Sequence, residues 1–320
     1  MVENFDEIKG TSLARDAWKR LLKNRLAVFG LVVICLTIIA VVVGPSIIEW
    51  TTGYTYDSQP TDSVLLRAMP PSLRHLMGTD ELGRDLLSRV LQGGRISLMV
   101  GVISTIVSLI VGVTYGALSG YLGGRIDNVM MRIVDIFYSI PYILIVIVLL
   151  SVFKGQNAPD WIQWLSTTFG GVGNQGLTQI FLLFFALGLV SWLTMARVVR
   201  GQILSLKNQE FVLAAKATGV STWGIVFRHL VPNTLGPVIV YATLTIPSVM
   251  LTEAFLSFLG LGVQAPYASW GSLALDGIKS IAIYPWLLVF PGVTMALTLF
   301  SMNFLGDGIR DALDPQTRKF

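Results

Sequence analysis

The chain has 320 residues, of which 53% are hydrophobic and only 13% are charged, and its mean hydropathy is +0.68. Soluble domains carry about 25% charged residues, so much of this chain must face lipid instead of water. The net charge of +4 does not indicate nucleic-acid binding, because the basic residues fall between apolar segments and form no single patch. One cysteine, Cys35, excludes a disulfide within the chain, and two histidines far apart in sequence argue against a metal site.

Six apolar segments are long enough to cross the hydrocarbon core of a bilayer, which takes about 20 residues of helix. They lie at residues 26–48, 96–119, 129–153, 177–196, 234–259 and 284–305. The first is too long for a signal-peptide core and no A-x-A-like cleavage site follows it, so we expect an uncleaved span. The sequence thus predicts an all-α membrane protein with six transmembrane helices.

Lys and Arg residues orient the predicted spans, since they concentrate in the cytoplasmic loops of membrane proteins. Most of them fall before the first span, in the second and fourth connections and after the last span. We therefore predict that the N- and C-termini are both cytoplasmic. The chain then begins with a cytoplasmic amphipathic segment (1–25) and a first transmembrane helix (26–49). An extracytoplasmic loop with an interfacial helix (50–95) leads to a five-helix core (96–305) and a cytoplasmic tail (306–320).

Two segments outside the spans have amphipathic helical patterns. In the N-terminal segment, Trp18, Leu21 and Leu22 can lie at the lipid interface while Arg15 and Lys19 meet the headgroups. In the outer loop, we expect Asp80 to cap a helix with its apolar residues on one side. Those apolar residues are Leu82, Leu86, Leu87 and Val90.

The sequence of the inner loop, residues 197–233, predicts two short helices that meet at an angle. Alanines favour a helix and give it a thin, smooth side, and they occur here as Ala214, Ala215 and Ala217. Such a side can fit into a groove of another protein, with Glu210 and Lys216 at its edges fixing the register. The alternative is an ordinary helix–turn–helix connection at the surface.

Three further residues shape this loop. Gly219 permits a sharp reversal of the chain with a positive φ. Ser221 can cap the second helix, and we expect Pro232 to end it.

The pattern Ala214-Ala215-x-x-x-Gly219, followed by Pro232, resembles the EAA loop of binding-protein-dependent ABC importers. In that family the loop forms a coupling helix that inserts into the ATPase subunit. The chain departs from the family consensus at three positions. Leu213 stands in place of the motif's glutamate, and His229 and Val231 replace the aliphatic residues that are usual at their positions.

Further motifs resemble the C-type permease subunit of oligopeptide and dipeptide importers, and together they cover nearly the whole chain. They are His75-x-x-Gly78-Thr79-Asp80-x-x-Gly83-Arg84-Asp85, Gly94-Arg95-x-Ser97, Gly123-Gly124-Arg125-x-Asp127, Met131-Arg132-x-x-Asp135 with Pro141, Gly260-Leu261-Gly262 before Ser269-Trp270-Gly271, and Gly306-Asp307-Gly308-x-Arg310-Asp311.

The resemblance implies an ABC importer type I permease fold in the cytoplasmic membrane of a bacterium or archaeon. It implies a homologous B-type permease subunit, two ATPase subunits and an extracytoplasmic peptide-binding protein as partners, with peptides as the substrate. ATP and Mg would bind the ATPase subunits, so no cofactor is expected in this chain. Permeases of this family for nickel chelates, glutathione or another small solute share these motifs and stand as an alternative.

Two carboxylates fall inside predicted spans, where ionisable groups usually face a cavity or a partner helix. Glu253 can line the transport pathway and meet the amino terminus of a peptide, or it can pair with a neighbouring helix or cap an irregular break before Gly260. Asp135 is expected to pair with Arg132 or Arg197. The uncharged stretch at residues 258–270 can form either a re-entrant turn or a plain outer loop.

Several catalytic signatures are absent from the sequence. It has no phosphate-binding G-x-x-x-x-G-K-[ST] loop, no H-E-x-x-H metal helix and no G-x-S-x-G nucleophile elbow. The chain is therefore expected to be a transporter subunit and not an enzyme. An intramembrane enzyme and a passive channel are the rival classes.

Overall fold

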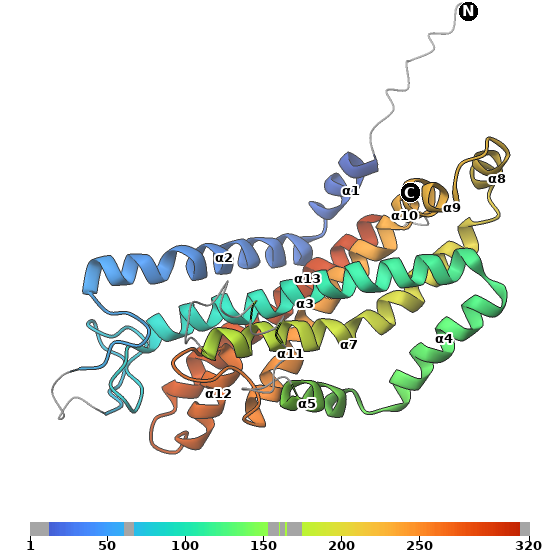
Figure 1. The fold of residues 1–320 in the computed structure, drawn as a ribbon. Helices are drawn as coiled ribbons and strands as arrows, with labels where there is room; N and C mark the ends of the chain where they lie inside the picture. Colours follow the sequence, from blue (N-terminus) through green and yellow to red (C-terminus); the bar gives the residue numbers. More distant parts are fainter. Residues whose placement is uncertain (1–12, 61–66, 153–159, 161–163, 165–174, 314–320) are drawn as a thin grey trace, which may run out of the picture.

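The computed structural model describes residues 13–60, 67–152, 160, 164 and 175–313. This part of the chain is built almost entirely of helices (Figure 1). The helices are α1 (Leu13–Leu21), α2 (Arg25–Thr52), α3 (Leu86–Leu122), α4 (Gly124–Ser139), α5 (Tyr142–Val152), α7 (Gln175–Leu206), α8 (Glu210–Ala217), α9 (Thr222–Gly224), the π-helix η3 (Ile225–Leu230), α10 (Val231–Asn233), α11 (Leu235–Phe258), α12 (Trp270–Lys279) and α13 (Trp286–Leu313).

Five of these helices are long and apolar enough to cross a membrane, and they match five of the six predicted spans. They are α2, α3, α7, α11 and α13. The remaining predicted span corresponds to α4 and α5, which pass the same test only as a pair. The prediction of a multi-span helical membrane protein is therefore confirmed.

The span predicted at residues 129–153 is not one straight helix, because α4 and α5 meet at an angle of 86°. Ile140 between them is extended, with φ −90° and ψ 130°. The cause is Pro141, whose ring disfavours helical geometry in the preceding residue and which has no N–H for a helical hydrogen bond. The break turns α5 across the bundle towards α7.

The second predicted span begins earlier than expected. The structure has one continuous helix from Leu86, so the predicted interfacial helix of the outer loop and the span are both parts of α3. Asp85 caps it by accepting a hydrogen bond from the backbone N–H of Ser88 at 2.8 Å. The prediction that Asp80 caps this helix is wrong, because its carboxylate instead closes a turn with the N–H groups of Leu82 and Arg84.

The two ends of the bundle carry different structures (Figure 1). One end holds α1, α8, α9, α10 and the C-terminal end of α13. The opposite end holds α12 and the loop between α2 and α3. The described ends of the chain therefore lie at the same end of the bundle as α8.

The N-terminal helix α1 packs on α13 and does not lie entirely at the surface. Leu21 is buried beside Ala312, which corrects its predicted place at the lipid interface. Trp18 and Leu22 are exposed, as a position at the interface requires.

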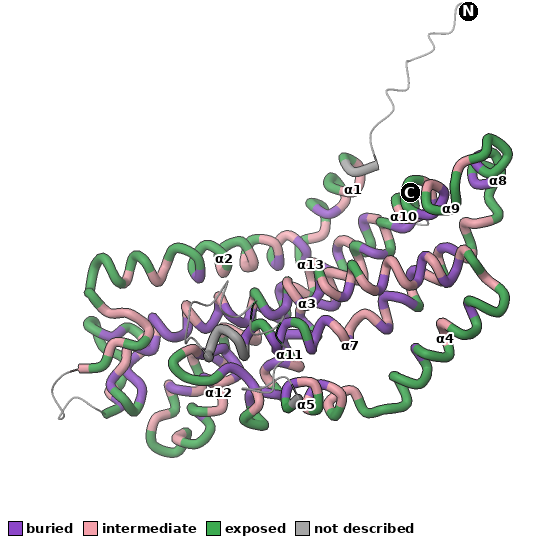
Figure 2. Tube along the Cα trace, in the orientation of Figure 1, coloured by how far each residue is buried: buried purple, intermediate pink, exposed green. Residues whose placement is uncertain are grey.

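The centre of the core is the long contact between α3 and α7, where buried residues predominate (Figure 2). Gly112, Gly116 and Gly120 recur at every fourth position of α3, which lets two membrane helices approach closely. A Cβ on Gly116 would lie 2.3 Å from the carbonyl oxygen of Ala196, so only glycine fits there. This contact joins α3 and α7 along most of their length.

Candidate functional site

The segment between α7 and α11 folds as two helical pieces joined by a tight turn. Gly219 stands directly after α8 with φ +79°. Its N–H donates to the carbonyl of Lys216, and the N–H of Val220 donates to the carbonyl of Ala215. This pair of bonds is the glycine-based helix stop of the Schellman type, so the predicted reversal at Gly219 is confirmed.

The second helical piece begins at Ser221, whose side chain accepts a hydrogen bond from the N–H of Gly224 at 3.3 Å. It then widens into η3, which places Ile225 and Leu230, five residues apart, on the same buried side. The piece ends at Asn233, directly after Pro232, as the sequence predicts. Thr234 then separates it from α11.

The predicted small-residue side of α8 is divided between the interior and the surface. Ala215 is buried and packs, together with Val212, against η3. Ala214 and Ala217 are exposed. The solvent-facing side of α8 also carries Glu210, Phe211, Leu213 and Lys216.

An aromatic pair extends this exposed surface. Trp223 stacks on Phe227 with the ring centroids 5.4 Å apart, and 61% of Trp223 is exposed. We call the exposed residues of α8 together with Trp223 and Phe227 the loop surface. An exposed apolar cluster of this kind, rimmed by polar residues, is typical of a protein-binding site.

A cavity of about 680 Å³ lies on the side of the bundle where α4, α5, α7 and α11 meet. Its polar lining consists of hydroxyl groups and, among the described residues, includes no charged side chain. The hydroxyl groups belong to Tyr138, Tyr142, Ser191, Thr194, Tyr241, Thr245, Ser248 and Thr252. The break at Pro141 forms part of the wall, so non-helical backbone faces this space.

A second, separate cavity of about 660 Å³ lies nearer the end of the bundle that holds α8. Tyr241 and Leu244 line both cavities. The second cavity also contacts Gln202, Asn233 and Arg310. Both cavities are therefore lined by residues of α7 and α11.

Glu253 lies away from both cavities, since it lines neither of them and only 1% of it is exposed. Its Oε1 atom accepts hydrogen bonds from the hydroxyls of Ser257 and Ser269, each at 2.7 Å. Ser269 is the N-cap of α12. Glu253 therefore fastens α12 to α11. This agrees with the interpretation that it bonds to a neighbouring part of the protein and does not line the pathway.

The stretch before α12 lies against the protein. Ala268, Ser269 and Trp270 are buried, and the indole N–H of Trp270 donates to the carbonyl oxygen of Val90 at 2.8 Å. The backbone N–H of Trp270 donates to the hydroxyl of Ser97 at 3.0 Å. These bonds hold the non-helical stretch on α3.

Two ion pairs join α4 to α7. Asp127 accepts two hydrogen bonds from Arg200, at 2.5 and 2.6 Å, and a third from the hydroxyl of Ser119. Asp135 pairs with Arg197 at 2.7 Å, so the expectation that it pairs with Arg132 or Arg197 is confirmed for Arg197.

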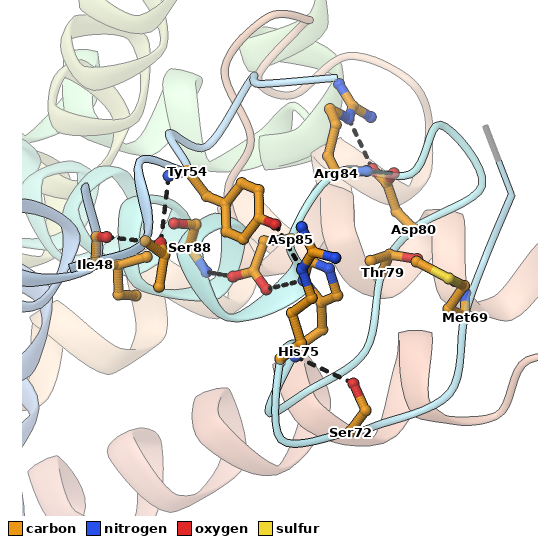
Figure 3. A network of polar contacts seen from close by, with 12 residues as sticks. Ile48, Tyr54, Met69, Ser72, His75, Thr79, Asp80, Arg84, Asp85 and Ser88 are labelled. Carbon is orange, nitrogen blue, oxygen red and sulfur yellow. Dashed lines mark hydrogen bonds and ion pairs between the residues drawn. The ribbon is translucent and has the colours of Figure 1, made fainter. Parts of the chain in front are cut away.

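The loop before α3 is held by a buried polar network (Figure 3). Nδ1 of His75 lies 2.9 Å from Oδ1 of Asp85, the residue that caps α3. The hydroxyl of Thr79 accepts from the N–H of Met69 at 2.8 Å, and the Nε of Arg84 donates to Asp80 at 2.7 Å. The motif residues that were prominent in the sequence thus give this loop a fixed shape at the end of the bundle opposite α8.

Comparison with known proteins identifies the family. Residues 112–319 match the family described as the binding-protein-dependent transport system inner membrane component. Residues 12–71 match the N-terminal transmembrane domain of oligopeptide transport permease C. The chain belongs to the C-type permease subunits of oligopeptide and dipeptide importers.

Individual relatives of this C-type permease align along almost their whole length. The oligopeptide transport system permease protein OppC of Escherichia coli K12 is 51% identical over 99% of this chain and 97% of its own length. OppC of Haemophilus influenzae is 45% identical over 98% of this chain and 91% of its own length. The dipeptide transport system permease protein DppC of Bacillus subtilis is 43% identical, with 98% and 90% covered.

The hydroxyl groups that line the cavity of this permease are absent from the residues predicted as a site. A signal for them exists on α11, where Tyr241, Thr245, Ser248 and Thr252 recur at intervals of three or four residues. That spacing places them on one side of a helix. Of the residues predicted for the site, the loop residues lie at one end of the bundle and Glu253 lies towards the other.

Proposed function

We propose that this chain forms one half of the membrane channel of an ATP-driven importer of oligopeptides or dipeptides. The observation that carries the proposal is the path of α7, which lines the cavity and leads through a short connection into α8 at the loop surface. A force applied to α8 therefore reaches the cavity wall through one continuous helix. The other half of the channel would come from a homologous B-type permease subunit.

The chemistry of the cavity suits peptides of varied sequence. Ser191, Thr245 and Thr252 donate their hydroxyl hydrogens to carbonyl groups of their own helices. Their oxygen lone pairs are then available to accept hydrogen bonds from the N–H groups of a peptide main chain. A wall without charged side chains does not select peptides by the charge of their side chains, so the choice of peptide would lie mainly with an extracytoplasmic binding protein.

The loop surface suits contact with an ATPase subunit. Phe211, Leu213 and Trp223 offer apolar area, Ala214 and Ala217 allow close approach, and Glu210 and Lys216 can fix the register at the rim. Two ATPase subunits would bind ATP and Mg, and this chain would hold no cofactor. A ligand shifts a conformational equilibrium only by the difference between its affinities for the two states. Binding of ATP to the ATPase subunits would therefore bias the equilibrium between the inward-open and outward-open states, and the loop surface would transmit this bias.

This proposal fixes the orientation of the chain in the membrane. With α8 at the ATPase side, both termini lie in the cytoplasm and the loop before α3 faces the binding protein. The membrane is then the cytoplasmic membrane of a bacterium or archaeon. The excess of Lys and Arg in the N-terminal segment and the inner loops supports the same orientation.

The decisive test is reconstitution of the chain with its B-type subunit, two ATPase subunits and binding protein in lipid vesicles. We expect uptake of labelled di- to pentapeptides that requires both ATP and the binding protein. Uptake of nickel chelates or glutathione in place of every peptide would support the same family with another cargo. Solute flux through vesicles that contain this chain alone would contradict the proposal and support a passive channel.

A further inference from the structure

The ion pair between Asp135 in α4 and Arg197 in α7 lies at the edge of the cavity. Asp135 stands one helical turn before Tyr138, and Arg197 stands one turn after Thr194, and both Tyr138 and Thr194 line the cavity. Because α7 runs towards α8 and α4 runs away from that end (Figure 1), the ion pair lies on the α8 side of the cavity.

The same four residues form a connected cluster. The guanidinium carbon of Arg197 lies 3.9 Å from the centre of the Tyr138 ring. The hydroxyl of Tyr138 is hydrogen-bonded to the hydroxyl of Thr194. The cluster therefore joins α4 to α7 through an ion pair, a cation–π contact and a hydrogen bond.

This cluster is open to its surroundings. The side chains of Arg197 and Asp135 are 44% and 55% exposed, although both belong to membrane-spanning helices. Charged groups in such helices usually face a cavity or a partner protein and not lipid. An exposed ion pair also contributes little net stability, so it can open and close without a large cost.

The second ion pair between these helices has the opposite character. Asp127 accepts a hydrogen bond from Arg200 on each of its two carboxylate oxygens, and the hydroxyl of Ser119 donates a third. The Asp127 side chain is only 8% exposed. Bidentate pairs of this kind hold a fixed geometry. Asp127 lies at the beginning of α4, so this pair holds one end of α4 on α7 while the rest of α4 can separate from it.

We propose that Asp135, Tyr138, Thr194 and Arg197 form the contact that closes the cavity towards α8, and that this contact opens when α7 moves with α8. The pair of Asp127 and Arg200 acts as the hinge. This inference rests on the proposed function, since it names the residues that shut one side of the transport path.

The test uses the reconstituted importer with Cys35→Ser as background, because Cys35 is the only natural cysteine. Asp135→Cys and Arg197→Cys are combined and joined with a short bis-methanethiosulfonate reagent, which dithiothreitol removes. We expect peptide uptake to fall about ten-fold on cross-linking, as for any transporter held in one of two states, and to return with dithiothreitol. Each single-cysteine variant treated in the same way is the matched control. Loss of the ion pair should already lower its uptake, and the reagent should not lower that uptake further.

A second set of variants keeps the test decisive if two cysteines alone impair the protein. Asp135→Asn and Arg197→Gln should each lower uptake at normal levels of assembled complex, and the exchange Asp135→Arg with Arg197→Asp should restore at least part of it. Undiminished uptake in the cross-linked importer, or in both single-charge variants, would overturn the inference. Absence of ATP-dependent uptake by the unmodified importer would instead overturn the proposed function.

Discussion

Arg95 in α3 donates a hydrogen bond from Nε to the carbonyl oxygen of Val41 in α2, at a distance of 2.5 Å. Val41 stands four residues before Pro45, which has no N–H, so its carbonyl lacks the usual helical partner. The Nη2 of Arg95 donates to the neighbouring carbonyl of Val42, also at 2.5 Å. In hydrocarbon an unpaired carbonyl is costly, so Arg95 both replaces the missing bond and fastens α2 to α3.

We expect Arg95→Gln to weaken the attachment of α2 by about 1.5–3 kcal/mol, the range for hydrogen bonds that involve a charged group. The melting temperature of the purified complex and amide exchange in α2 would measure this loss. Pro45→Ala in the Arg95→Gln background should recover part of it, because alanine supplies the N–H that Val41 lacks. Equal losses in the single and double variants would contradict the pairing of Arg95 with the proline gap.

The positive φ of Gly219 is expected to matter for coupling and not for insertion into the membrane. A Cβ at Gly219 meets no atom within 4 Å, so Gly219→Ala adds only the backbone cost of the left-handed conformation, about 1–2 kcal/mol. Gly219→Val should reduce peptide-stimulated ATP hydrolysis and uptake more strongly, and Gly219→Asn should reduce them less. Gly201→Ala is the matched control, since Gly201 also has open space but no positive φ. Normal transport by Gly219→Val would show that the turn geometry is dispensable.

Glu253 is expected to affect stability more than peptide selection. Glu253→Gln keeps an oxygen that can accept from Ser257 or Ser269, so peptide uptake should persist at normal protein levels. Glu253→Leu leaves both buried hydroxyls without that acceptor, which costs about 1–3 kcal/mol for an unsatisfied group. Thermal unfolding would measure this cost, with Leu251→Ala as an exposed control on the same helix. A change in peptide preference for Glu253→Gln at normal levels would instead assign Glu253 to the pathway.

Arg200→Lys should separate geometry from charge at the second ion pair between α4 and α7. Lysine keeps the charge but cannot make the two parallel bonds to Asp127. Because the Arg200 side chain is 32% exposed, we expect a modest loss of about 1 kcal/mol. Spin labels on α4 and α7 should report a broader distance distribution in this variant. An unchanged distribution would mean that a point charge suffices to hold α4.

The sequence predicts the spans well because apolar length determines them, but it fails where one residue changes the direction of a helix. Pro141 was visible in the sequence, yet a hydropathy pattern contains no information on how far the chain bends there. The start of α3 was misplaced for a related reason. Asp80 and Asp85 are both able to cap a helix, and only the fold around His75 decides that Asp85 does so.

The loop between α7 and α11 shows the same division. Gly219 and Ser221 act locally, so the sequence was enough to predict the turn and the cap. Whether Ala215 faces its own protein or a partner depends on η3 packing behind α8, and this long-range contact cannot be read from spacing. The cavity is harder still to predict, because its hydroxyl groups come from four helices that only the complete fold brings together.

The π-helix η3 makes the shape of the loop surface depend on chain length. A π turn holds one residue more than an α turn, and each residue rotates an α-helix by about 100°. Deletion of a single residue within Ile225–Leu230 would return the stretch to α geometry. The same deletion would rotate Trp223 by about 100° relative to α11, while α8 stays attached to α7 at its other end. Trp223 would then no longer lie beside α8, so the loop surface depends on the number of residues in η3 as well as on their identity.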